Sequence, residues 1–525
     1  MKPFSPNRSF LFSALVALTL GVATAPAADW PEWGYDSSKN MVQPNAKDLP
    51  VTLKPGTAKP GTEEIDLATT ENVVWVAKLG SQSYGNPTVA QGKVFVGTNN
   101  ESPRDPEITG DRGNIYCFDE KTGEFLWQLV VPKLGAGKVS DWEYIGICSS
   151  PTVDGDRVYI VTNRCEIMCL DINGLADGNQ GPFMDEATYY ADRGQPPVKL
   201  HDKLADIIWV YDMRNELGVF PHNTTSNSIL IVGDKLFTAT SNGMDWSHTN
   251  IPNPSAPALV CLDKNTGKLL GEDGSGVSAR VLHANWSSPA YGEIDGVGQV
   301  IWGGGDGWAY GFGLDAKKDD EGFDILPELW RFDANPASYW KDADGNPIRY
   351  ATALGPSEII STAVVYDGKA YFAIGQDPEH GDGVGAITCV DPSKRGDITK
   401  SGKVWQYTGI GRTISTPSIA DGLVFIAEYA GKVHALDAQT GEAYGVYDTK
   451  SRIWGSTLVA DGKVYIGDED GELIVLSADK ELKELGKVNM GAPVYSSPVA
   501  TDDTVFVATQ THLYAISKTA PKADE

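Results

Sequence analysis

The sequence predicts an all-β fold: a single eight-bladed β-propeller of four-stranded antiparallel blades, closed by a strand from the N-terminal part of the chain. A strand start made of small residues recurs eight times. Between these starts, apolar residues alternate with a period of two and are separated by turns rich in Gly and Asp. In addition, the last unit lacks a fourth strand, and an unpaired strand sequence precedes the first unit.

The first 28 residues have the pattern of a signal peptide. Lys2 and Arg8 provide a basic start, an apolar run extends from Phe10 to Val22, and small residues follow up to Ala28. This run is shorter than the roughly 20 residues of a membrane-spanning helix. We therefore expect residues 1–28 to direct Sec-dependent export, and the mature protein to be periplasmic or secreted, without a membrane anchor.

The next segment provides the strand that closes the ring. Residues 29–70 form an N-terminal extension, and NVVWVAKLG at 72–80 reads as a fourth strand. The last unit ends after its third strand, HLYAIS at 512–517, so the early strand should complete it and remove the open edges. We expect the propeller to span 71–518 and a flexible tail to occupy 519–525.

Eight units follow one another along the chain. Each start is followed by a polar turn, two alternating β runs and, in most units, an Asp-x-x-Thr-Gly turn before a fourth strand, which is the pattern of a four-stranded meander. The starts are YGNPTV at 84, CSSPTV at 148, SNSILI at 226, WSSPAY at 286, ISTAVV at 360, ISTPSI at 414, WGSTLV at 454 and YSSPVA at 495.

Composition limits the partners. The formal charge is −27 for 525 residues, which disfavours nucleic acid and anionic membranes as partners. We also expect the protein to be a monomer. Of the six cysteines, Cys117, Cys169, Cys261 and Cys389 recur at one equivalent strand position and read as small core residues. Disulfide pairing among the six stays open.

The stretch CFDEKTGEFLW at 117–127, with similar stretches ending in Trp209, Trp330 and Trp405, resembles the tryptophan-docking repeat of the PQQ-like propellers. That superfamily includes quinoprotein alcohol dehydrogenases and the outer-membrane assembly lipoprotein BamB. The resemblance implies that these tryptophans pack between neighbouring blades, with Trp75 in the same place in the closing strand. Gly271 and Gly445 replace the tryptophan in the third and sixth units, so those junctions should pack differently.

The loop lengths indicate where a site would lie. In a meander, the loop between strands two and three and the connection to the next blade share one face, and the long loops of this chain fall on that face. They are 98–113, 132–146, 241–258, 331–358 and 375–385. Binding residues concentrate on loops held by a rigid scaffold, so this long-loop face is the expected functional face.

Titratable and aromatic residues gather in these loops. Oxygen-rich loops suit calcium, whereas histidines suit zinc, copper or iron, and the metal-ligand candidates are His222, His248, His283, His380, Glu379 and Asp382. Candidates for acid–base work are His283, His380, Glu358 and Asp377. Candidates for stacking on a cofactor are Trp286, Trp246 and Trp142.

Three functions fit this sequence, and whether it is an enzyme stays open. The first is a binding or scaffold propeller with a protein partner or a small-molecule or carbohydrate ligand on the long-loop face. The second, implied by the resemblance, is a dehydrogenase of alcohols or sugars that uses PQQ and calcium, although the chain has no adjacent cysteine pair and no CxxCH haem motif. The third is a His/carboxylate metal-dependent enzyme acting on polysaccharide.

Overall fold

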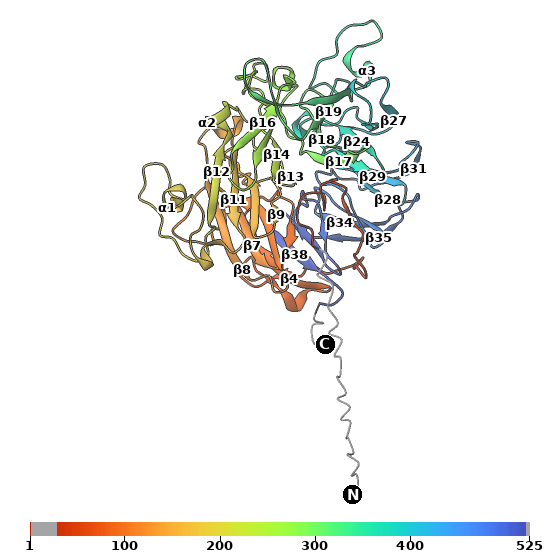
Figure 1. Ribbon diagram of the computed structural model, residues 1–525. Helices are drawn as coiled ribbons and strands as arrows, with labels where there is room; N and C mark the ends of the chain where they lie inside the picture. The colour runs from red at the N-terminus through yellow and green to blue at the C-terminus, as the bar shows by residue number, and fades with distance from the viewer. Residues whose placement is uncertain (2–28, 521–525) are drawn as a thin grey trace.

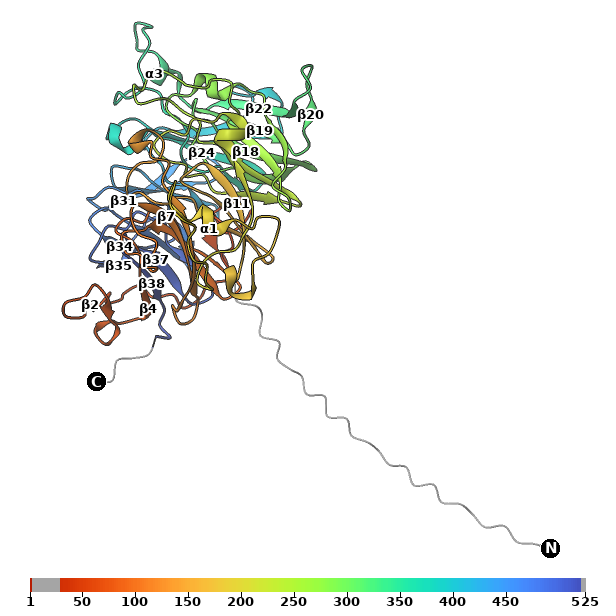
Figure 2. The same cartoon turned by 90° about the vertical axis from the view of Figure 1, so that its left-hand side faces the viewer.

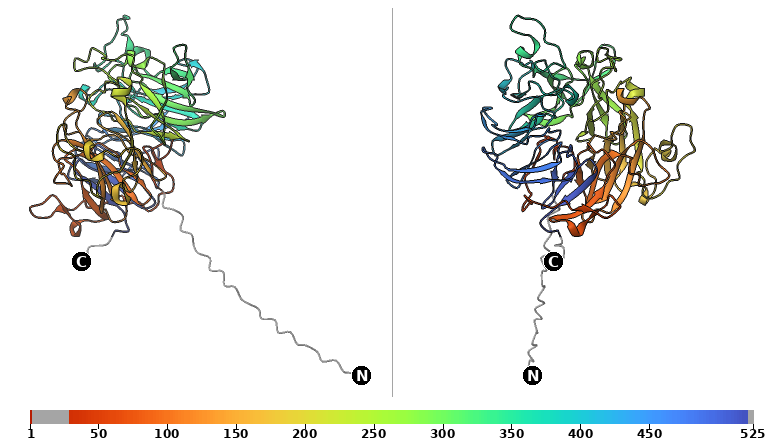
Figure 3. Two further views of the ribbon diagram at one scale, coloured as in Figure 1. Left: turned by 60° about the vertical axis from the view of Figure 1, so that its left-hand side comes forward. Right: turned by 180° about the vertical axis from the view of Figure 1, so that it is seen from behind.

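Eight small antiparallel sheets follow one another around a ring in the computed structural model, which describes Met1 and residues 29–520 (Figure 1). The predicted signal peptide and the end of the predicted tail lie outside the described residues. Seen from behind, in the right-hand view of Figure 3, the sheets again succeed one another in chain order. The predicted eight-bladed propeller is confirmed.

Each of the first four blades contains four strands, ordered from the central channel outward. They are β5 (Thr88–Ala90), β6 (Lys93–Asn99), β7 (Arg112–Asp119) and β8 (Phe125–Pro132) in blade 1; β9 (Thr152–Asp154), β10 (Arg157–Val161), β11 (Glu166–Asp171) and β12 (Ile207–Asp212) in blade 2; β13 (Leu230–Val232), β14 (Lys235–Ala239), β15 (Leu259–Asp263) and β16 (Leu269–Asp273) in blade 3; and β17 (Ala290–Ile294), β18 (Val297–Gly303), β19 (Trp308–Gly313) and β22 (Glu328–Asp333) in blade 4.

The last four blades repeat this plan. They contain β23 (Val364–Tyr366), β24 (Lys369–Ile374), β25 (Ala386–Val390) and β27 (Lys403–Tyr407) in blade 5; β28 (Ser418–Ala420), β29 (Leu423–Ala427), β30 (Lys432–Asp437) and β31 (Ala443–Asp448) in blade 6; β32 (Leu458–Ala460), β33 (Lys463–Gly467), β34 (Glu472–Ser477) and β35 (Glu484–Asn489) in blade 7; and β36 (Val499–Ala500), β37 (Val505–Ala508), β38 (His512–Ile516) and β4 (Val73–Lys78) in blade 8.

Blade 8 joins the two ends of the described chain. Its outer strand β4 pairs antiparallel with β38, with Trp75 opposite Ala515, as predicted for the closing strand. In Figure 1 the red β4 therefore lies beside the blue β38.

Additional short elements decorate the ring. The strands β21 (Asp324–Leu326) and β26 (Gly396–Asp397) extend blades 3 and 4 at their outer edges, β20 (Lys317–Lys318) pairs with β21, and β1 (Val42–Gln43) pairs with the inner strand β32. The hairpin of β2 (Thr57–Ala58) and β3 (Ile65–Asp66) projects beside β4 in Figure 2. The short helices are α1 (Glu186–Tyr189), α2 (Met213–Leu217) and α3 (Ala337–Trp340). Within the described residues, no helix has the length and apolar character needed to cross a membrane.

Local sequence explains the hairpins. In five blades both central residues of the first turn have positive φ, which is the type I′ turn that matches strand twist and favours Asp-Gly. These pairs are Gln91–Gly92, Asp295–Gly296, Asp367–Gly368, Asp421–Gly422 and Asp461–Gly462. Each blade also has one register shift between its third and fourth strands, as between Cys117 and Phe118 in blade 1.

The apolar cores lie between neighbouring sheets. Phe95 of blade 1 and Ile160 of blade 2, for example, belong to one buried cluster. Trp127 at the same junction is buried, and its indole donates a hydrogen bond to the Ile172 carbonyl of the next blade at 3.0 Å. Trp75, Trp209 and Trp405 make equivalent bonds to the following blade, whereas Trp330 donates to Gln299 within its own blade.

Three blades place glycine where the other five have tryptophan. A Cβ at Gly271 would meet Ala316 and Asp324 in the connection between β19 and β22, and one at Gly445 would meet the Lys480 carbonyl of blade 7. Backbone therefore packs closely at these junctions in place of an indole ring. Gly486 of blade 7 is a third such position, next to the Val51 carbonyl, which the sequence reasoning did not include.

Residues 30–43 close one end of the central channel. In seven of the eight blades the sixth residue of the repeated strand start, which lies in the inner strand, is hydrogen-bonded to this segment. These residues are Val89, Val153, Tyr291, Val365, Ile419, Val459 and Ala500. The inner strands are edge strands with backbone groups that face the channel, so the segment satisfies groups that would otherwise need water. The long-loop face lies at the opposite end of the same strands.

Candidate functional site

The channel forms a cavity of about 460 Å³ on the long-loop side of residues 30–43. Its wall contains the first residue of all eight repeated strand starts: Tyr84, Cys148, Ser226, Trp286, Ile360, Ile414, Trp454 and Tyr495. Side chains alternate along a strand, so the third residue of each start should face the same space. Seven of these third residues do line it: Asn86, Ser228, Ser288, Thr362, Thr416, Ser456 and Ser497.

The third residues also tie neighbouring blades together. In six junctions the backbone N–H of one donates to the side-chain oxygen of the next at 2.6–3.0 Å. Asn86 donates to Ser150 at 3.3 Å, so the network also spans the junction of blades 1 and 2. The small polar residues that mark the repeat thus hold the cavity wall in a fixed shape.

Aromatic rings cover the floor and one side of the cavity. Trp33, from the N-terminal segment, lines it and donates to Thr362 Oγ1 at 2.9 Å. On the wall, Tyr84 and Tyr495 are stacked with ring centroids 5.3 Å apart, and Trp454 lies 5.1 Å from Tyr495. Trp142 and Trp286 line other parts of the wall. The cavity therefore offers flat apolar surfaces above a ring of hydroxyl groups.

The charged side chains at the cavity are acidic. Glu143, Asp377 and Glu379 line it, and among the described lining residues none is lysine or arginine. Burial raises the pKa of Asp377, whose carboxylate accepts a hydrogen bond from Asn223 at 3.2 Å. This electrostatic environment disfavours an anionic ligand.

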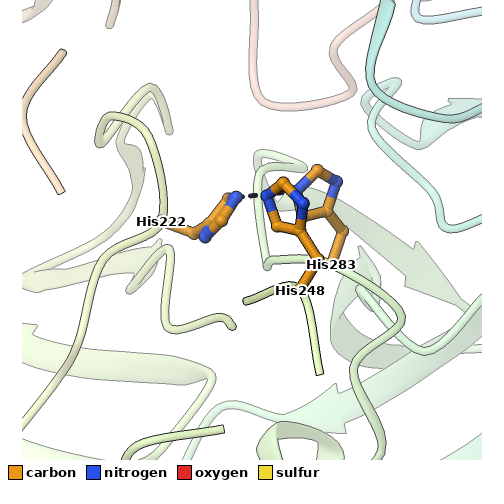
Figure 4. Close-up of side chains that lie close together, drawn as sticks. All are labelled: His222, His248 and His283. Atoms are coloured by element: carbon orange, nitrogen blue, oxygen red, sulfur yellow. Dashed lines mark hydrogen bonds between the residues drawn. The ribbon is translucent and has the colours of Figure 1, made fainter. Parts of the chain in front are cut away.

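Three histidines converge beside the cavity (Figure 4). The rings of His222 and His283 contact Trp286, which lines the cavity. His222 comes from the connection between blades 2 and 3, His248 from the long loop of blade 3, and His283 from the connection between blades 3 and 4. One ring nitrogen of each lies within 4.8 Å of the others. His222 and His283 are buried and His248 is exposed, so the cluster opens toward solvent on one side.

Hydrogen bonds fix the orientation of the two buried rings. His222 Nδ1 lies 2.6 Å from the Met244 carbonyl, which can only accept, so Nδ1 carries the proton and Nε2 presents a lone pair. That lone pair faces His283 Nε2 at 2.7 Å. On the other side, His283 Nδ1 lies 3.0 Å from Tyr350 Oη, which is 3.0 Å from a Glu358 oxygen.

Burial keeps the two buried imidazoles neutral. It lowers the pKa of His222 to about 4 and that of His283 to about 2, and the neighbouring imidazoles add to both shifts. Burial also lowers the pKa of His380 to about 4 and holds that of the Glu358 carboxyl well above its usual value. His222, His283 and His380 therefore present unprotonated nitrogens near neutral pH.

A family model described as outer membrane protein assembly factor BamB matches residues 65–283 and 383–517, about two thirds of the chain. The chain belongs to this family. Its fold is similar to that of BamB from Moraxella catarrhalis, with a TM-score of 0.53 and 13% identity over 85% of this chain and 99% of that one. No curated protein matches the chain.

Two dehydrogenase structures resemble this BamB-family chain more distantly. A europium-containing methanol dehydrogenase has a TM-score of 0.47 and 10% identity over 93% of this chain and 98% of that one. A quinohemoprotein alcohol dehydrogenase from Comamonas testosteroni has a TM-score of 0.45 and 14% identity over 94% of this chain and 81% of that one.

The cavity of this BamB-family propeller does not fit PQQ. The quinone is a tricarboxylate, and a site for it needs positive or strongly donating groups. Here the charged residues at the cavity are Glu143, Asp377 and Glu379, and no basic side chain is among the described lining residues. The described lining residues therefore lack the basic groups that would pair with the three carboxylates of PQQ.

The structure brings some of the site residues that the sequence suggested together and leaves others outside the site. His222, His248 and His283 converge, His380 stacks on His283 with ring centroids 5.4 Å apart, and Glu358 connects to His283 through Tyr350. Asp377, Glu379, Trp142 and Trp286 line the cavity. Asp382 is exposed and lies outside the histidine group, and Trp246, 65% exposed, does not line the cavity in the described structure.

Two important residues were missed. Tyr350 lies in an irregular loop where no pattern marks it. Trp33 belongs to the N-terminal extension, whose route across the channel has no counterpart in the repeat. By contrast, the first position of the eight strand starts could have predicted the cavity wall. Residues at the same position of every repeat occupy equivalent places around the ring, so these eight side chains surround the same channel.

Proposed function

We propose that this protein is an exported, ligand-binding propeller whose central cavity takes a neutral carbohydrate. The observation that carries the proposal is the combination, at one cavity, of aromatic faces, a ring of hydroxyl groups and acidic but not basic charges. Sugar rings present apolar C–H faces that stack on indole and phenol rings, and their hydroxyl groups pair with Ser, Thr and Asn side chains.

The size of the cavity also supports a small-molecule ligand. The cavity of about 460 Å³ lies within the range of about 300–1,000 Å³ that is usual for small-molecule sites.

Titration of the purified full chain with oligosaccharides tests this proposal. We expect neutral sugars to bind with a change in tryptophan fluorescence, and uronic-acid sugars to bind more weakly, most clearly at low salt. Trp454→Ala should lower the affinity at least tenfold. Trp246→Ala, an exposed indole on the same face, is the matched control and should bind as the native chain does. Equal affinities for both variants would contradict the proposal.

A protein partner is the second candidate, because the family is described as an assembly factor and the long-loop face exposes apolar side chains. Tyr144, Trp246 and Leu354 are 45%, 65% and 64% exposed in its loops. Cross-linking in the cell envelope distinguishes the candidates: a defined adduct that Trp246→Ala and Leu354→Ala abolish, and that saturating sugar leaves unchanged, would favour the protein partner. N-terminal sequencing of the envelope protein tests the proposed export.

A further inference from the structure

The cluster of His222, His248 and His283 has the features of a metal site rather than of hydrogen-bonded core histidines. Two of its rings are buried and face each other through nitrogens 2.7 Å apart, and the third approaches from an exposed loop. The three ring centroids form a compact triangle with sides of 4.3, 5.0 and 5.1 Å. From this geometry we propose that the cluster binds one divalent transition-metal ion, of the zinc and cobalt class, through three imidazole nitrogens.

The outer nitrogens of the buried rings are occupied as a metal site requires. His222 Nδ1 donates to the Met244 carbonyl, and His283 Nδ1 faces Tyr350, which in turn faces Glu358. Metal-bound histidines almost always use the second ring nitrogen in this way, because that contact fixes the ring and its tautomer. Both Nε2 atoms are therefore oriented toward the same space.

The gap between the two Nε2 atoms is consistent with an ion replacing a proton. Because His222 carries its proton on Nδ1, the contact at 2.7 Å needs a proton on His283 Nε2 when no ion is bound. Zinc–nitrogen bonds of about 2.0–2.1 Å at a tetrahedral angle place two ligand nitrogens about 3.3 Å apart. Binding therefore requires the rings to separate by only about 0.6 Å while His283 moves its proton to Nδ1, toward Tyr350.

The chemistry of the donors selects the ion. Three neutral imidazoles and no carboxylate in the group favour zinc, cobalt, nickel or copper over calcium and magnesium, which prefer oxygen ligands. Three histidines leave a fourth position open, as in metal sites that hold a water molecule or a ligand oxygen.

Cobalt titration of the metal-free full chain tests the site. We expect one equivalent of Co²⁺ to bind with the intense visible bands of a four- or five-coordinate ion, and Zn²⁺ to displace it. His248→Asn should lower Co²⁺ affinity at least tenfold without changing the melting temperature of the metal-free chain, because His248 is exposed and asparagine tolerates its φ of +51°. His283→Ala should abolish the bands.

Two further variants make the result specific. Tyr350→Phe removes the oxygen that orients His283, and should lower metal affinity by about 10- to 100-fold. His201→Ala is the control, because His201 pairs with Asp105 elsewhere on the surface and should bind Co²⁺ as the native chain does. Weak six-coordinate spectra, no binding, or equal affinity in His248→Asn and His201→Ala would each overturn the proposal.

Discussion

Replacement of Trp75 by Ala should weaken the attachment of β4 to β38, the place where the ring is closed by hydrogen bonds and packing alone. Trp75 is 3% exposed, packs between Phe118 of blade 1 and Phe506 of blade 8, and donates to the Glu120 carbonyl at 2.8 Å. Truncation of a buried tryptophan to alanine costs about 3–5 kcal/mol, including the cavity left behind. We therefore expect the free energy of unfolding to fall by about 4 kcal/mol.

Two measurements follow from this magnitude. Unfolding entropy is about 2.1 cal/mol/K per residue, so for the roughly 490 described residues the melting temperature should fall by only about 4 °C if the ring unfolds as one unit. Local opening of β4 is more sensitive, because about 4 kcal/mol raises the population of the open form by about 1,000-fold. Tryptic cleavage at Lys78, at the end of β4, should accelerate accordingly.

Trp127→Ala provides the matched control. Trp127 is equally buried and makes the same type of hydrogen bond, but it joins blades 1 and 2, which are continuous in the chain. We expect a similar loss of thermal stability without faster cleavage at Lys78. If the two variants are cleaved there at the same rate, Trp75 does not secure the closing strand and the reasoning is wrong.

Three other perturbations test the packing and the titrating groups. Gly123→Ala should destabilise by about 1–3 kcal/mol more than Gly92→Ala on thermal melting, because both have positive φ but only at Gly123 would a Cβ lie 2.6 Å from the Trp75 ring; equal losses would refute this. Burial raises the pKa of Asp306 to about 6, above its unfolded value, so stability should fall by up to about 3 kcal/mol as pH rises from 4 to 6 and then level off. Asp306→Asn should remove this dependence in urea unfolding, and parallel pH profiles would count against it. All six cysteines lie in the described residues and are free, so six thiols should react after denaturation without reductant and fewer would reveal a disulfide.

The repeat determines most of the fold, and the reason is physical. Ser288 and Ser456 occupy the same position in different units, so ring symmetry alone gives them equivalent places at the channel. The cysteines also recur at one position of the repeat. Cys117 and Cys389 each lie opposite a tryptophan of the neighbouring strand, where a small side chain leaves room for the indole.

The site is less predictable because it depends on where irregular loops converge. His222 and His283 are 61 residues apart in the sequence and touch only because blades 2 to 4 are adjacent. The sequence suggested both residues among six metal-ligand candidates, yet Glu379 and Asp382 come from the same kind of loop and lie outside the three-histidine group. Loop composition indicates the face of the molecule, whereas the choice among its residues requires coordinates.

The route of residues 30–43 across the channel has a consequence for how the chain folds. This segment and β4 emerge early in synthesis, but their partners include Ala500 and β38, which emerge almost last. Contacts of such large sequence separation form slowly, and unpaired strand edges are prone to aggregate in the interval. The protein should therefore need protection by a chaperone until its last blade is complete, and a chain truncated before blade 8 should fail to close even though seven of its blades have their full sequence.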